Sequence, residues 1–225
     1  MHLGTFGLAI ALVAVIVIAV PGLCVETSNP QTAIESSSNV TTVDNETWQL
    51  FVDEPDQHFQ KARESFLKKD LDTAATQIRK SAAFLKLEVG RATKEGKDVL
   101  ADSIAELEKL ADGVEGRTVT SVNKIDDAFA RAEHALAKHH YLKASESWAK
   151  KEIKNSGQEL KAATFHLERS LAWAEYKTGT VVNDIRSLAG KLIRGTGWVS
   201  EEVNKGMDAL VGEIEILGKK IRPAK

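Results

Sequence analysis

The feature that most constrains the fold is an apolar period of three or four residues, which runs from about residue 49 to the end of the chain. One run consists of Val122, Ile125, Phe129, Ala132 and Leu136. The last run consists of Val203, Met207, Leu210, Ile214, Leu217 and Ile221. This spacing places apolar side chains on one face of a helix, and no comparable segment alternates with period two. Helices with narrow apolar faces need neighbours for stability, so the sequence predicts an all-α helical bundle.

Glycine and capping residues indicate where these helices begin and end. Glycines near residues 90, 113–116, 179 and 195–197 predict helix ends. Asp70 and Ser121 are suited to the N-cap position, where a side-chain oxygen accepts a hydrogen bond from the first turn. These breaks divide the region into five to seven helices.

The helical region contains a weak internal duplication. The segment 59–74 aligns with 129–144 through its aromatic, leucine and alanine positions. The segment 74–90 aligns with 162–179, with about a dozen residues inserted around 148–158 in the second copy. The predicted fold is therefore two related helix-hairpin repeats, followed by a C-terminal amphipathic helix.

Alanine where two helices touch, with Phe, Leu or Tyr beside it, resembles tetratricopeptide packing. The chain lacks the 34-residue period and the Trp-Leu-Gly positions of that family. The stretches 59–75 and 129–144 also resemble exported bacterial helical proteins of the YfdX kind. This resemblance implies export and a helical fold, and it carries no functional residues.

The first 25 residues predict export or membrane anchoring. Residues 3–25 contain no charged side chain, and 8–20 is an almost unbroken run of Ala, Val, Ile and Leu. Pro21 and Gly22 break this run and small residues permit cleavage before Val25, as in a signal peptide. The apolar stretch of about 18–23 residues also suits a retained anchor. Lipidation of Cys24 is a third alternative, although a leucine precedes it.

Residues 26–48 are predicted to form a flexible linker. They are rich in Ser, Thr and Asn and contain almost no large apolar side chain, so burial cannot offset the entropy of ordering them. Asn39 and Asn45 begin Asn-x-Thr patterns, which accept glycosylation in a suitable host. The predicted domains are a signal peptide or membrane anchor at 1–25, a disordered linker at 26–48 and an α-helical domain at 49–225.

Composition and motifs exclude several classes of protein. All 30 Lys and Arg residues and 28 of the 32 Asp and Glu residues are interspersed along the helical region, so the sequence predicts no basic stripe for nucleic acid. A single cysteine excludes an internal disulfide framework, a four-cysteine zinc site and a cysteine-ligated iron–sulfur cluster. The metalloprotease, di-iron and phosphate-loop motifs are missing from the sequence. We therefore expect no enzyme, no cofactor, no bound metal and no nucleic-acid partner.

The best candidates for chemistry lie in the second predicted repeat. Four of the six histidines, at positions 134, 139, 140 and 166, fall within 33 residues. The candidate ligand-binding residues are His134, His140, Tyr141, His166 and Trp173. The repeat alignment places His139 and His140 at a turn between helices, which predicts solvated histidines there and His166 at the rim of the bundle. The alternative is a Zn²⁺, Cu²⁺ or haem site formed by His134 or His140 with His166.

The C-terminal segment 199–221 is the strongest signal for a non-catalytic role. Its apolar stripe either packs back onto the bundle or serves self-association or a protein partner. The sequence therefore predicts an exported or membrane-tethered, non-catalytic helical bundle, which acts as a structural or interaction module of the cell envelope. The alternative is an extracytoplasmic small-ligand or metal-binding protein. For both functions the expected location of the protein is extracytoplasmic, in the periplasm or secreted from the cell. The protein contacts the membrane through 1–25 if that segment is uncleaved.

Overall fold

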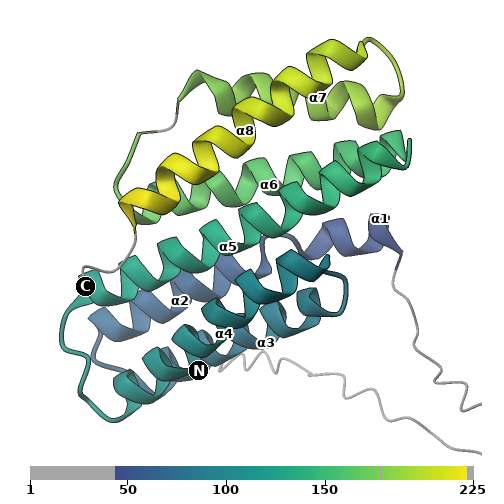
Figure 1. Cartoon of the computed structure of the whole chain (residues 1–225). Helices are drawn as coiled ribbons and strands as arrows, with labels where there is room; N and C mark the ends of the chain where they lie inside the picture. The colour runs from purple at the N-terminus through teal and green to yellow at the C-terminus, as the bar shows by residue number, and fades with distance from the viewer. Residues whose placement is uncertain (1–43, 178, 222–225) are drawn as a thin grey trace, which may run out of the picture. The chain divides into compact units, whose positions relative to one another are not determined.

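The computed structural model describes residues 44–177 and 179–221, which are helical with no strand among them (Figure 1). The elements are α1 (Asn45–Trp48), η1 (Gln49–Phe51), α2 (Glu54–Leu67), α3 (Leu71–Val89), α4 (Lys94–Glu115), α5 (Val122–Ala149), α6 (Ile153–Trp173), α7 (Thr180–Arg194) and α8 (Ser200–Lys220). Helices α2 to α8 pack as a bundle of seven within this described part of the chain. The predicted all-α class is confirmed.

Several helix termini fall where the sequence predicts them. Asp70 is the N-cap of α3, and its carboxylate accepts a hydrogen bond of 3.2 Å from the Thr73 backbone N–H. Gly195 follows α7 with a φ of 72°, a left-handed conformation that glycine adopts without steric cost. Ser121 precedes α5, although its side chain makes no capping hydrogen bond there.

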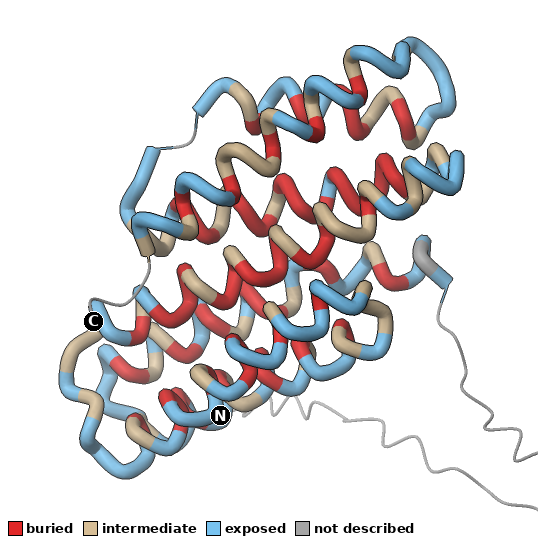
Figure 2. The backbone as a smooth tube through the Cα atoms, viewed as in Figure 1, coloured by how far each residue is buried: buried red, intermediate tan, exposed pale blue. Residues whose placement is uncertain are grey.

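Two apolar clusters share α5 as a common wall. The first cluster joins α2, α3 and α4 to the N-terminal half of α5, and Phe59 stacks on Phe129 at its centre with ring centroids 4.3 Å apart. The second joins the C-terminal half of α5 to α6, α7 and α8. Along α5 the first cluster ends at Leu136 and the second begins at Ala137. Figure 2 shows the buried positions concentrated on α5 and α6.

The apolar stripe of α8 is covered by the chain itself. Its members at positions 203, 207, 210, 214 and 217 are buried, and α8 packs against α5 and α7. This burial follows from the near-heptad spacing, which keeps all of them on one side of the helix. Self-association or partner binding through 199–221 stays a prediction.

Helix α5 differs from the sequence expectation. The predicted turn at His139 and His140 is wrong, because α5 runs without a break through both residues. No glycine or proline lies between Val122 and Ala149, so nothing in this stretch favours a helix end. Helix α2, its partner in the repeat alignment, has 14 residues against 28 in α5.

The described structure begins inside the range assigned to the linker. Helix α1 lies within 26–48, and its Trp48 side chain is buried against Phe84, with ring centroids 5.5 Å apart. The burial of this indole explains why the helical region extends to residue 45. The predicted signal peptide or anchor at 1–25 lies outside the described residues. Among the residues described, no helix has both the length and the apolar character to cross a bilayer.

Candidate functional site

A layer of buried ionisable side chains lies among α3, α5 and α6. It consists of Glu88 from α3, Glu133, His139 and His140 from α5, and Glu159 and His166 from α6. Each is exposed by 2 % or less. Charged and titratable side chains are rarely this buried unless they pair with one another or hold an ion. The helices that supply them come from both apolar clusters, so the layer forms only when the two halves of the bundle are in contact.

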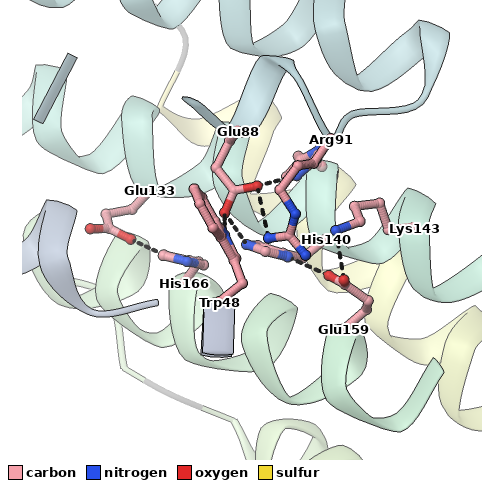
Figure 3. Close-up of polar contacts among 9 residues, drawn as sticks. Trp48, Glu88, Arg91, Glu133, His140, Lys143, Glu159 and His166 are labelled. Carbon is pink, nitrogen blue, oxygen red and sulfur yellow. Dashed lines mark hydrogen bonds and ion pairs between the residues drawn. The ribbon is translucent and has the colours of Figure 1, made fainter. Parts of the chain in front are cut away.

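Glu88 is the centre of this layer. Its Oε1 accepts a hydrogen bond from the Trp48 indole N–H, and its Oε2 lies 3.0 Å from His139 Nε2. Oε1 also lies 3.7 Å from His140 Nε2, and Arg91 Nη1 lies 3.9 Å from Oε2. Figure 3 shows the Glu88 carboxylate directed toward Trp48, His140 and Arg91. A single carboxylate thus faces two imidazoles, one indole and one guanidinium.

His140 is held from its other edge by Glu159. His140 Nδ1 lies 2.6 Å from Glu159 Oε2, and Lys143 Nζ lies 2.6 Å from Glu159 Oε1. With Nδ1–H donating to this carboxylate, the lone pair of the ring is on Nε2, the atom that faces Glu88. A hydrogen bond of this kind orients metal-binding histidines in many proteins.

The three side chains around this point are close enough together to hold one metal ion. Glu88, His139 and His140 each offer one ligand atom, and these atoms lie within 4.8 Å of one another. The separations to the two Glu88 oxygens, 3.0 Å from His139 Nε2 to Oε2 and 3.7 Å from His140 Nε2 to Oε1, lie on either side of the ligand–ligand distance around a tetrahedral zinc ion, which is about 3.3 Å for bonds of about 2.0–2.1 Å. Imidazole and carboxylate are also ligands for iron, nickel and copper ions.

His166 and Glu133 form a second buried pair beside the first. His166 Nδ1 lies 2.7 Å from Glu133 Oε2, and the His166 ring stacks on that of His140 with centroids 5.2 Å apart and planes 4° from parallel. Within the described residues, His166 Nε2 and Glu133 Oε1 have no hydrogen-bond partner. In Figure 3 this pair lies at the opposite end of the layer from Lys143 and Glu159.

Burial and pairing shift the pKa values of these groups in different directions. Burial lowers the pKa of His140 to about 4, although Glu159 and Glu88 oppose this change. Burial favours a raised pKa for Glu159, but the hydrogen bond from His140 and the ammonium group of Lys143 lower it to about 2. Burial raises the pKa of Glu133, and His166 only partly offsets it. At neutral pH the layer therefore contains a neutral His140 beside an ionised Glu159.

In the metal-free protein, we expect His140 to stay neutral as the pH falls from 6.5, the ordinary pKa of histidine, to about 4, the lowered pKa of this residue. The unfolded chain takes up a proton on this residue in that range while the folded chain does not, so His140 reduces the stability of the fold as the solution is acidified. The ring proton shifts of His140, assigned by their loss in His140→Gln, measure its pKa in an NMR titration. A midpoint near 6.5 contradicts this expectation.

The structure brings together two of the five residues proposed from the sequence, His140 and His166. His134 turns toward α8 instead, where its Nε2 lies 2.8 Å from the Ile214 carbonyl oxygen. Tyr141 packs against the second apolar cluster. Trp173 packs edge-on against Phe129 in the first cluster and donates a hydrogen bond of 3.0 Å to Asp56.

Sequence reasoning missed His139 and all three glutamates. The expectation of solvated histidines at 139 and 140, and of His166 at the rim, is wrong, since each of the three is fully buried. A signal for Glu88 was present in the sequence, because it follows Leu85 by three positions on the buried face of α3. A glutamate in an apolar stripe indicates a buried partner of opposite charge or an ion.

Comparison with known proteins gives no significant match to a family model, a curated protein or a solved structure. The residues of the buried layer are therefore the basis for a function.

Proposed function

We propose that this protein binds a divalent first-row transition-metal ion, with Zn²⁺ the best match, through Glu88, His139 and His140. The observation that carries the proposal is the convergence of three buried ligand atoms within 4.8 Å of one another. Two histidines and one carboxylate form a common ligand set for zinc. This is the metal-binding alternative of the two functions that the sequence predicts.

An unsatisfied polar atom of the layer supports this proposal. Among the described residues, His140 Nε2 lacks a hydrogen-bond partner in an interior where such an atom costs about 1–3 kcal/mol. His140 Nε2 faces the Glu88 carboxylate across 3.7 Å. A cation between these two atoms gives the nitrogen a partner and neutralises the carboxylate. Glu159 is already placed to orient His140, and the Trp48 N–H is placed to orient Glu88.

The proposed role is to hold the ion, as a carrier or as a structural element. The side chains of Glu88, His139 and His140 have no exposed surface, so an organic substrate does not reach an ion between them. We propose that this activity lies outside the cytoplasm, as the export segment expected at 1–25 implies. The structural or interaction role also predicted from the sequence is compatible with an ion that stabilises the bundle.

The proposal is tested by equilibrium binding of Zn²⁺ to the full chain after removal of metals with a chelator. We expect one Zn²⁺ per chain by isothermal titration calorimetry and elemental analysis. His139→Gln and His140→Gln are each expected to weaken binding by about 100-fold or more, since each removes a direct ligand. Co²⁺ in place of Zn²⁺ is expected to give the visible absorption bands of a tetrahedral site.

His134→Gln is the matched control, because this histidine is also on α5 but contacts α8. It is expected to bind Zn²⁺ as the unmodified protein does. Circular dichroism verifies that each variant is folded. The absence of Zn²⁺ binding, or equal binding by His140→Gln and His134→Gln, overturns the proposal and leaves the layer with a purely structural role.

A further inference from the structure

A polar cavity of about 350 Å³ lies beside the buried layer. It is lined by the C-terminal part of α5, the start of α6 and Arg91, which follows α3. One of its lining residues, Glu159, belongs to the layer and contacts His140. Two more lie beside the layer, since Lys143 is paired with Glu159 and Arg91 lies near Glu88. The cavity is therefore separated from the proposed metal ligands by single side chains.

The cavity is lined by three carboxylates, Glu146, Glu152 and Glu159, and by three basic side chains, Lys143, Lys150 and Arg91. Glu146 at the outside has a side chain that is 48 % exposed, whereas Glu159 at the inside is 2 % exposed and touches His140, which is fully buried. Lys143, between them in exposure at 14 %, is paired with Glu159. Hydrated divalent cations lose water most readily where carboxylate oxygens replace it, so this order of carboxylates suits the passage of a cation.

Arg91 lies between the cavity and Glu88. Its guanidinium group stacks over the Trp48 ring at 4.4 Å and its Nη1 lies 3.9 Å from Glu88 Oε2. Figure 3 shows Arg91, Lys143 and Glu159 on the side of the layer away from Glu133. The positive charge of Arg91 repels a cation that approaches Glu88 from the cavity, and the Arg91 side chain occupies part of the path between them.

We infer that metal ions enter and leave the proposed centre through this cavity. Glu159 is the innermost carboxylate of the route, and the Arg91 side chain obstructs the route beside Glu88. This inference rests on the proposed function. The ammonium group of Lys143 neutralises Glu159 in the empty protein and moves aside when the cation arrives. The flexible four-carbon stem of lysine permits this movement, and the cavity provides space for it. Exchange of the ion then depends on side-chain motion and leaves the helices in place.

The test is the rate of Co²⁺ uptake by the full chain, followed by absorbance in a stopped-flow instrument, and its release to excess chelator. Ser147→Trp on α5 and Asn155→Trp on α6 each fill the cavity from an opposite wall. Each is expected to slow uptake and release by about tenfold or more, with an unchanged dissociation constant. Arg91→Met removes the positive charge that repels the ion and is expected to speed release by about tenfold.

Ala105→Trp is the matched control, because it fills a separate groove between α4 and α5. It is expected to leave both rates unchanged. Full Co²⁺ binding with unaltered rates in both Ser147→Trp and Asn155→Trp overturns the route but leaves the metal centre intact. Failure of the unmodified chain to bind Co²⁺ overturns the proposed function, and the route with it.

Discussion

Replacing Glu88 by alanine is expected to lower the free energy of unfolding by about 3–5 kcal/mol. The substitution leaves the Trp48 N–H and the His139 Nε2 without their partner, and it removes a fully buried carboxylate that lies 3.9 Å from Arg91 Nη1. Breaking a buried pair costs this much because the remaining groups keep their desolvation penalty. Urea denaturation of the metal-free protein at pH 7 measures the effect.

Glu108→Ala is the control for this substitution. Glu108 is paired with Lys86 at 2.5 Å, but both side chains are about half exposed, and exposed pairs contribute about 0–1 kcal/mol. We expect this variant to unfold within about 0.5 kcal/mol of the parent protein. Equal losses for Glu88→Ala and Glu108→Ala contradict the view that the buried layer supports the fold.

Gly157→Ala is expected to destabilise the protein by about 1–3 kcal/mol, although alanine is the better helix former. A Cβ atom at position 157 lies 2.7 Å from the Leu192 Cβ, 2.9 Å from the Ile193 backbone nitrogen and 3.0 Å from the Ala189 carbonyl oxygen. All three atoms belong to α7, two of them to its backbone and the third directly bonded to it. They therefore cannot move without separating α6 from α7. The same denaturation experiment gives the change in free energy.

Gly212→Ala provides a control of opposite sign. This glycine lies inside α8, and a Cβ atom there meets nothing within 4 Å. The replacement is expected to stabilise the protein by about 0.5–1 kcal/mol, because only the helix propensity changes. If Gly157→Ala is also stabilising, α6 and α7 are not packed as closely as described.

The sequence was sufficient to predict the helices, because the signal for them is local. Every member of the α8 stripe from Val203 to Leu217 is buried, as its spacing predicts. The turn expected at His139 and His140 came from aligning them with Lys69 and Asp70, which lie in the turn between α2 and α3. In α5 no glycine or proline interrupts the helix, so the backbone continues through both histidines.

The candidate site could be predicted only in part, since its contacts join residues distant in the sequence. His139 and Glu88 are 51 residues apart, and His166 and Glu133 are 33 apart. The clustering of histidines indicated His140 and His166. Which glutamates they meet depends on how α3 and α6 pack against α5, and apolar periodicity does not specify that packing.

The position of α5 as a wall common to both apolar clusters also has a consequence for cooperativity. Loss of either half exposes apolar surface on the same helix, so neither half retains a complete core when the other unfolds. Glu88 belongs to one half and Glu159 to the other, with His140 between them. An ion held at this junction favours only the fully assembled chain, so its binding energy adds to the stability of the molecule as a whole.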